Sequence, residues 1–184
     1  MTRRLGEARR IFGQLETVWK HANISKDSKI RILDACVVSK LMYSLESMWL
    51  LHDNRVKLDG FYASCLRKIL KIPSAYLSRV TNRRVLEIAG WPILSQQLLS
   101  KQLNLYGKIY RMDGSSLVQK MTFKDDSSNA QCWGTKRRVG RPRLQWSSCV
   151  RADAVAIAAE HALDLEEVMG SKTLWEKAVR SYCF

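Results

Sequence analysis

The placement of proline constrains the fold of this chain more than any other feature of its sequence. Proline occurs only at positions 73, 92 and 142 of the 184 residues, so long stretches lack the residue that most effectively breaks a helix. Within these stretches apolar residues recur every three or four positions, which is the spacing of one helix face. Alternating patterns typical of strands are weak. The sequence therefore predicts an all-α fold.

Two helices are predicted before residue 52. The first would end near Asn23 and carry Phe12 and Trp19 on its apolar face. Ser25 has the side chain of a helix N-cap and would open a long second helix that reaches Leu51. The apolar stripe of this second helix comprises Ile30, Leu33, Val37, Leu41, Leu45 and Met48. The stripe is wide enough to belong to the core.

A third helix is predicted to begin around Asp53 and to end before Pro73. Its apolar face would leave Arg67, Lys68 and Lys71 pointing toward solvent. Thr81 is placed to cap a fourth helix, which Gly90 and the proline at position 92 would end. A fifth helix would begin at position 95, and a short one is expected around positions 117–121.

Three regions are predicted from these patterns. Residues 1–123 would form one helical domain. Residues 124–135 are polar and are expected to form a mobile linker. Residues 136–184 would hold a basic arm followed by a helical hairpin, built from helices over 142–162 and 174–182.

The basic arm, residues 136–143, points to phosphate binding. It holds Lys136, Arg137, Arg138, Arg141 and Arg143 without a single acidic residue. Each cation that neutralises a phosphate releases condensed counterions, so such a run supplies affinity for nucleic acid of any sequence. Three alternatives remain open, namely a solvated surface loop, a nuclear localisation signal and an AT-hook. An AT-hook would have Arg where this chain has Val139.

A second basic zone lies in the predicted helical domain. The chain carries a net charge of +14, and no acidic residue occurs between Asp59 and Glu87. We expect Arg67, Lys68, Lys71, Arg83 and Arg84 of this zone to contact phosphates as well. Charge alone would also suit an anionic membrane surface, but two separated basic zones favour an extended polyanion such as RNA or DNA.

Trp146 follows the basic arm directly and is a candidate for stacking on a base. It also lies on the first turn of an apolar helix, and this position favours packing in the core. For the cations borne on helices, a solvated face and a phosphate-binding surface are both compatible with the sequence.

The sequence holds no recognisable catalytic or metal-binding motif, and no cofactor is expected. The five cysteines form no CxxC pair, and the three histidines stand far apart. Asp125 and Asp126 follow an aromatic residue as polymerase aspartates do, but their loop-like flanks argue against catalysis. No apolar run approaches the length of a membrane span. We expect a protein of the nucleus or cytoplasm, although the Arg-rich N-terminus also has some character of a mitochondrial presequence.

Several segments occur in an order that is similar to one known family. They are Phe12-Gly13-Gln14-Leu15 through Trp19, Ile24-Ser25 with Lys29, Val38-Ser39-Lys40-Leu41-Met42-Tyr43, Glu46-Ser47-Met48-Trp49, Leu58-Asp59-Gly60-Phe61, Cys65-Leu66-Arg67-Lys68-Ile69-Leu70, Arg79-Val80-Thr81-Asn82, Gly107-Lys108-Ile109-Tyr110-Arg111, Gly140-Arg141-Pro142-Arg143 with Trp146, and Trp175. Together they resemble the region after the palm in the reverse transcriptases of LINE-type (non-LTR) retrotransposons.

This resemblance implies a thumb-like helical bundle and a carboxyl-terminal extension that grip template and primer or the element RNA. It also implies partners, namely RNA, DNA or an RNA–DNA hybrid, and a polymerase palm supplied in trans. The chain lacks segments resembling the palm and fingers with their catalytic aspartates, or the endonuclease. We therefore expect this chain alone to bind nucleic acid without catalysis.

Two other interpretations of the sequence are open. The chain could be a helical module that docks a partner protein through exposed apolar surface around Trp49 and Leu51. It could also be the remnant of a truncated element with no selected function. Neutralising the arginines of the basic arm separates nucleic-acid binding from apolar docking, because only the former depends on them.

Overall fold

The computed structural model describes residues 1–21, 23–124, 127–131 and 144–184. Within these ranges the regular structure is helical, and the only β contact is an isolated bridge between Phe123 and Ala130. The predicted all-α fold is therefore confirmed. The chain divides into two compact units, which we call unit 1 (Met1–Ser44 and Leu50–Gln97) and unit 2 (Leu45–Trp49 and Leu98–Phe184).

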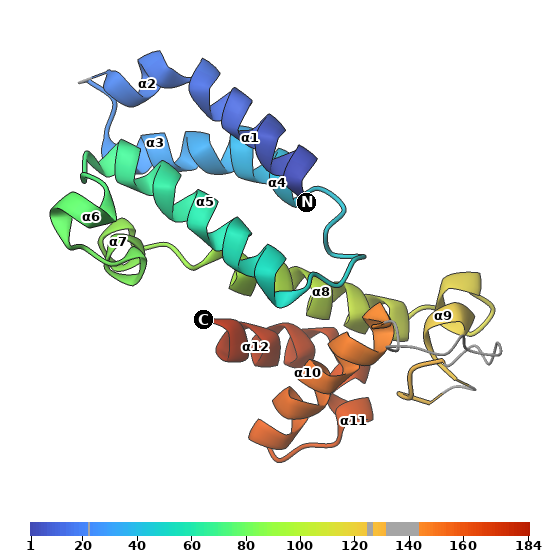
Figure 1. The fold of residues 1–184 in the computed structure, drawn as a ribbon. Helices are drawn as coiled ribbons and strands as arrows, with labels where there is room; N and C mark the ends of the chain where they lie inside the picture. The colour runs from blue at the N-terminus through green and yellow to red at the C-terminus, as the bar shows by residue number, and fades with distance from the viewer. Residues whose placement is uncertain (22, 125–126, 132–143) are drawn as a thin grey trace. The chain divides into compact units, whose positions relative to one another are not determined.

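Unit 1 is built from the helices of the first half of the chain (Figure 1). Its elements are α1 (Thr2–Gln14), α2 (Glu16–Lys20), α3 (Lys26–Leu33), the π-helical η1 (Asp34–Val38), α4 (Ser39–Met42), α5 (His52–Leu70), α6 (Ala75–Ser78), α7 (Asn82–Ala89) and the first turn of α8 (Leu94–Tyr110). The long α5 contacts α1, α2, α3 and α7. It is therefore the central element of the unit.

Several helix ends of unit 1 follow from single residues that the sequence identifies. The Ser25 side chain accepts a hydrogen bond from the backbone N–H of Ser28, so it is the N-cap of α3, as predicted. Thr81 caps α7 in the same way through the N–H of Arg84. Gly90 ends α7 with a φ of 67°, in the left-handed region that glycine adopts readily.

The prediction of one continuous helix reaching Leu51 is wrong. The chain passes through the π-helical turn η1 and leaves the helix after Met42, because Tyr43 has a non-helical ψ of 124° and Ser44 has a φ of 58°. Leu45 and the four residues after it belong to unit 2, where the side chain of Gln102 donates to the carbonyl of Met48. The predicted stripe therefore breaks, with Leu45 buried and Met48 half exposed.

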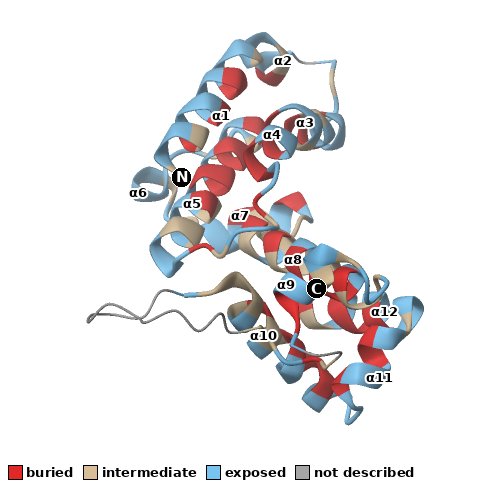
Figure 2. Cartoon of the chain, turned by 90° about the vertical axis from the view of Figure 1, so that its right-hand side faces the viewer, coloured by how far each residue is buried: buried red, intermediate tan, exposed pale blue. Residues whose placement is uncertain are grey.

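The core of unit 1 lies between α1, η1 and α5, where the buried residues of Figure 2 gather on the facing sides of the helices. The rings of Phe12 and Trp19 stack with centroids 5.0 Å apart, and the indole N–H of Trp19 donates to the carbonyl of Phe12. Lys29 is buried and donates to the carbonyls of Trp19 and His21, at 2.8 and 2.7 Å. This lysine therefore caps the carboxyl end of α2.

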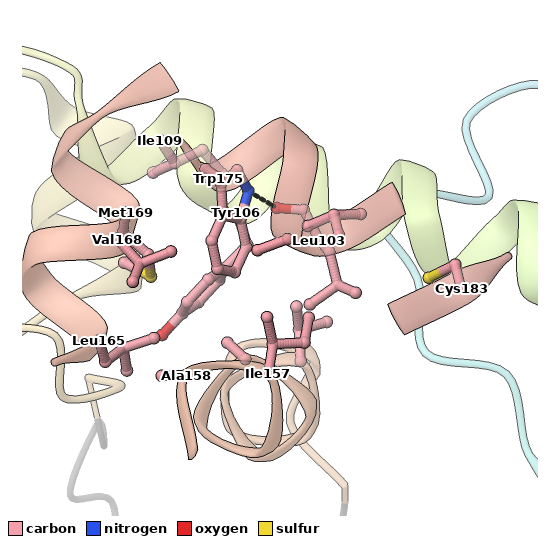
Figure 3. Close-up of a cluster of buried hydrophobic side chains, with 14 of the residues drawn as sticks. Leu103, Tyr106, Ile109, Ile157, Ala158, Leu165, Val168, Met169, Trp175 and Cys183 are labelled. Atoms are coloured by element: carbon pink, nitrogen blue, oxygen red, sulfur yellow. Dashed lines mark hydrogen bonds between the residues drawn. The ribbon is translucent and has the colours of Figure 1, made fainter. Parts of the chain in front are cut away.

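Unit 2 contains the rest of α8, then α9 (Leu117–Thr122), α10 (Trp146–Glu160), α11 (Leu165–Gly170) and α12 (Lys172–Cys183). Trp175 is at the centre of its core, fully buried, and its indole N–H donates to the carbonyl of Leu103 at 3.0 Å (Figure 3). Gly107 of α8 makes room for this indole, since a Cβ on Gly107 would lie 2.3 Å from the Trp175 nitrogen. The cluster also includes Tyr106, Ile109, Phe123, Val150, Ala154, Ile157, Val168 and Met169.

The predicted boundary of the helical domain at residue 123 is wrong. Leu103, Tyr106 and Phe123 pack in one cluster with residues of α10, α11 and α12, so the second half of α8 shares its core with the carboxyl-terminal helices. The predicted carboxyl-terminal hairpin of two helices is also wrong in detail, because a third helix, α11, occurs between α10 and α12 in the sequence. Asp164 caps α11 by accepting from the N–H of Glu166.

The linker predicted over residues 124–135 is wrong for the part that the structure describes. Lys124 donates its N–H to the carbonyl of Asn129, and Gln131 donates to the carbonyl of Thr122. Arg151 of α10 donates to the carbonyl of Ser128, which also accepts from the Tyr106 hydroxyl. These contacts fix residues 127–131 against unit 2. The other residues of the predicted linker, 125, 126 and 132–135, lie outside the described residues.

Candidate nucleic-acid interface

The predicted site residues fall into three groups in the structure. The basic arm with Lys136, Arg137, Arg138, Arg141 and Arg143 lies outside the described residues, as does the Asp125-Asp126 pair. Arg67, Lys68, Lys71, Arg83 and Arg84 all belong to unit 1. Trp146 belongs to unit 2.

Basic charge is concentrated in unit 1 rather than spread evenly. Unit 1 holds 17 Lys and Arg against 7 Asp and Glu, a net charge of +10. Unit 2 without the basic arm holds 9 Lys and Arg against 10 Asp and Glu, a net charge of −1. The remaining charge of +5 lies in the arm. A positive field of this kind attracts polyanions to unit 1 and to the arm.

Arg67 does not point to solvent, and that prediction is wrong. The residue is only 8% exposed. Its guanidinium donates to the carbonyls of Pro73 and Val80 and, at 3.1 Å, to the side-chain oxygen of Asn82. The planar group with several fixed donors satisfies three acceptors at once. Arg67 therefore organises the chain between α5 and α7 and has no surface to offer to phosphate.

The segment that Arg67 organises carries exposed cations, which we call the basic patch, namely Lys71, Arg79, Arg83 and Arg84. The Arg67 guanidinium bonds to Pro73, Val80 and Asn82, and each cation of the patch is one or two positions along the chain from one of these three residues. Figure 1 shows α6 and α7 beside the carboxyl end of α5, so the patch lies at one end of unit 1. Arg79 is a patch member that the sequence prediction of contacts left out.

Lys71 and Arg79 adopt an unusual backbone conformation. Their φ angles are 57° and 55°, in the left-handed region that a residue with a Cβ occupies at a cost of about 1–2 kcal/mol. Lys71 terminates α5, where the N–H of Ile72 donates to the carbonyl of Arg67, and Arg79 terminates α6. Glycine is the usual residue at such helix ends. Here long cationic side chains occupy both positions.

Arg83 and Arg84 share the carboxylate of Glu87 on the surface of α7. The nitrogen–oxygen distances are 3.5 Å from Arg83 and 3.0 Å from Arg84, and all three side chains are well exposed. Exposed ion pairs contribute little to stability, typically about 0–1 kcal/mol. Phosphate oxygens can therefore replace Glu87 as partners of either guanidinium at small cost, and the two arginines outnumber the one carboxylate.

Lys68 lies on the surface between α1 and α5. Its ammonium group is 5.6 Å from the centre of the Phe12 ring. Burial raises the pKa of the Cys65 thiol to about 12, while the nearby charges of Lys68 and Arg9 lower it slightly. Lys68 also helps to lower the pKa of Glu16, after the larger effects of the Lys20 hydrogen bond and charge. Lys68 is exposed, and because its ammonium group lies over a ring of α1 rather than in the segment that Arg67 organises, we do not count it in the basic patch.

Sequence reasoning missed an exposed aromatic residue inside the basic zone. Tyr76 of α6 is 87% exposed and its neighbour Leu77 is 72% exposed. Both lie in the short interval between Lys71 and Arg79. The only sequence signal for this exposed pair is the order of residue types, in which an aromatic and an aliphatic residue follow Pro73 and have a cation before and after them. That interval is too short for helical periodicity to reveal its conformation.

Trp146 packs mainly within unit 2. It is partly buried against the cluster around Trp175, and its ring centroid lies 6.1 Å from that of Tyr106 in an edge-on arrangement. Its indole nitrogen is buried and has no hydrogen-bond partner. Packing is the role that the sequence favoured, and the side chain is only partly exposed.

The apolar surface expected around Trp49 and Leu51 is divided between the two units. Trp49 packs, partly buried, against the core cluster of unit 2, whereas Leu51 is half exposed at the start of α5 in unit 1. Among the described residues, no group of three or more His, Cys, Asp or Glu side chains is placed to hold a metal ion. None of the described helices has the length and apolarity that a membrane crossing requires.

Comparisons with models of protein families, with curated proteins and with solved structures found no match to this chain.

Proposed function

We propose that this chain binds nucleic acid, RNA or DNA, through phosphate contacts made by the basic patch and the basic arm, and that it does so without catalysis. The observation that carries the proposal is the exposed patch of Lys71, Arg79, Arg83 and Arg84 at one end of a unit with net charge +10. Each phosphate contact adds affinity by counterion release, whatever the base sequence.

The order of segments that resembles the post-palm region of LINE-type reverse transcriptases supports the same function. In that setting, the basic surfaces would hold template and primer, an RNA–DNA hybrid or the element RNA, beside a palm supplied in trans. The patch residue Arg79 begins one of the resembling segments, and the basic arm contributes another. Template and primer, the hybrid and the element RNA all belong to the proposed class of partner, an extended polyanion.

The test compares three variants of equal charge change. The patch variant carries Lys71→Gly, Arg79→Gly, Arg83→Gln and Arg84→Gln, and the arm variant neutralises Arg137, Arg138, Arg141 and Arg143. The control neutralises Lys101, Lys108, Lys120 and Lys177, four exposed lysines of unit 2. Affinity for a structured RNA, a DNA duplex and an RNA–DNA hybrid is measured by fluorescence anisotropy at one salt concentration.

We expect the patch and arm variants each to bind all three ligands at least about tenfold more weakly than the control, because they remove phosphate contacts and the control does not. Equal affinities of all three variants would contradict the proposal, since they would show that only net charge matters. A wild-type protein that binds none of the three ligands would also contradict it.

A further inference from the structure

The short helix α6 exposes its side chains to a degree that packing does not explain. None of its four residues is buried, and Figure 2 shows it as an exposed element of unit 1. Tyr76 is 87% exposed. A tyrosine ring normally buries a large apolar area in a core or an interface. Tyr76 does neither within unit 1, so its ring is available to a partner.

Hydrogen bonds rather than packing hold α6 in place. The Ser78 hydroxyl donates to the carbonyls of Pro73 and Ser74, at 3.2 and 3.0 Å. Arg67 of α5 also fixes the segment, because its guanidinium donates to the carbonyls of Pro73 and Val80 before and after α6. The backbone that carries Tyr76 is thus fixed before any partner binds, which reduces the entropy lost on binding.

Cations precede and follow Tyr76 along the chain. Lys71 and Arg79 precede and follow α6, and both hold their left-handed conformation at the cost described above. Arg83 and Arg84 follow in the first turn of α7. Acidic residues are absent from the whole interval between Asp59 and Glu87. The segment that carries the ring is therefore cationic, so it complements a polyanion and opposes a partner surface rich in Lys and Arg.

We propose that Tyr76 is a stacking platform for an unpaired base, and that the basic patch is the site of a single-stranded segment of nucleic acid. An aromatic face bordered by cations is the arrangement with which proteins hold single strands, because the ring stacks on a base while the cations follow the phosphates. In a duplex the bases are paired and stacked on each other, and no face is free for Tyr76. This inference rests on the proposed function and adds the class of nucleic acid.

The experiment compares Tyr76→Ala with Tyr43→Ala in the full chain. Tyr43 is a matched control, since it is 77% exposed and belongs to the same unit. The ligands are a short oligothymidine, an abasic oligonucleotide of the same length and a duplex. The abasic strand offers the same phosphates without bases, so it separates stacking from charge. A Tyr76→Trp variant tests whether another aromatic ring suffices.

We expect Tyr76→Ala to weaken binding of the oligothymidine about 5- to 150-fold, the range for loss of one base–aromatic stack. Tyr43→Ala and Tyr76→Trp should bind it like wild type, and Tyr76→Ala should leave the abasic and duplex affinities unchanged. Equal effects of Tyr76→Ala on the abasic and base-bearing strands would overturn the inference.

An unchanged oligothymidine affinity in Tyr76→Ala would also overturn the inference. If the patch variant still weakens binding in that case, the proposed function stands and only the stacking role of Tyr76 fails. If the patch and arm variants also bind as the unit 2 control does, both proposals fail.

Discussion

Gly107 is the position where a single added carbon should do most harm. A Cβ there would lie 2.3 Å from the Trp175 nitrogen and 2.6 Å from the neighbouring ring carbon, and Trp175 is fully buried and hydrogen-bonded. We expect Gly107→Ala to lower the free energy of unfolding by about 1–3 kcal/mol, as overpacking does. Urea denaturation followed by tryptophan fluorescence measures the change.

The matched control is Gly60→Ala in the middle of α5, where nothing lies within 4 Å of the added carbon. Alanine should stabilise this helix by up to about 1 kcal/mol, because it loses less backbone entropy than glycine. Equal effects of the two substitutions would show that the close approach of Gly107 and Trp175 is absent in solution.

Lys71 and Arg79 allow charge to be removed without loss of fold. Glycine removes the energetic cost of the left-handed conformation at both positions, but it also raises the conformational entropy of the unfolded chain. The double variant Lys71→Gly, Arg79→Gly should therefore unfold at the same or a slightly higher temperature than wild type, while its affinity for nucleic acid falls. A clear loss of thermal stability, measured by circular dichroism, would show that these side chains support the fold instead.

Asp59 should give unit 1 a pH-dependent stability of a definite sign. Its carboxylate accepts from the N–H of Ser95 at 2.8 Å, and burial raises its pKa above 3.8 despite that bond. A raised pKa in the folded state means that the charged carboxylate destabilises the fold. This cost decreases as the pH falls through the pKa of the folded state, and it is gone below the pKa of the unfolded state. Asp59→Asn keeps an acceptor for Ser95 and removes the charge.

We therefore expect Asp59→Asn to be more stable than wild type at neutral pH, with the difference shrinking as the pH falls toward 3.8. Denaturant titrations across this range give the difference directly. The control is Asp53→Asn, since Asp53 lies in the exposed first turn of α5, where a negative charge is favourable. A less stable Asp59→Asn at neutral pH would show that the hydrogen bond of the charged carboxylate to the Ser95 N–H outweighs the cost of burying the charge.

At the scale of elements, Arg67 should control the segment between α5 and α7. Arg67→Ala removes three hydrogen bonds and leaves the Val80 carbonyl without its guanidinium donor, while the Pro73 carbonyl keeps only the Ser78 hydroxyl, so it should cost at least about 2 kcal/mol. Exchange of the Ser78 and Arg79 amides, which donate to the carbonyls of Ser74 and Ala75, should accelerate. Amide exchange measured by NMR spectroscopy tests this, with the amides of α1 as the internal control.

Arg67→Lys should not restore the protection, because one ammonium group cannot reproduce the fork of guanidinium donors. Both variants should also weaken nucleic-acid binding, although Arg67 itself is buried, because the basic patch loses its fixed backbone. Normal protection of Ser78 and Arg79 in Arg67→Ala would mean that packing, not Arg67, holds α6.

Local signals predicted most helices, and their failures have physical causes. Ser25, Thr81 and Gly90 mark helix ends through their own side chain or backbone freedom, so the sequence reveals them. The π-helical turn η1 and the left-handed Ser44 interrupt a stripe that looks continuous in the sequence. The short helices α6 and α11 span four and six residues, and periodicity is not informative over such lengths.

At the scale of the whole molecule, the sequence did not predict which helices share a core. Periodicity identifies an apolar face but not its partner, and for this reason the second half of α8 was assigned to the wrong domain. The same limit applies to the candidate site. Lys68 and Lys71 are exposed as predicted, whereas the burial of Arg67 and the exposure of Tyr76 depend on how the chain turns after α5.

The dependence of affinity on salt tests the central claim, phosphate binding, most directly. The affinity of the wild-type protein and of the patch variant for one DNA duplex is measured across a salt series, and log K is plotted against log[salt]. If the four patch cations contact phosphates, the slope of the patch variant should be shallower by about 3 to 4. Identical slopes for the two proteins would contradict the account, because the patch would then contribute no phosphate contacts.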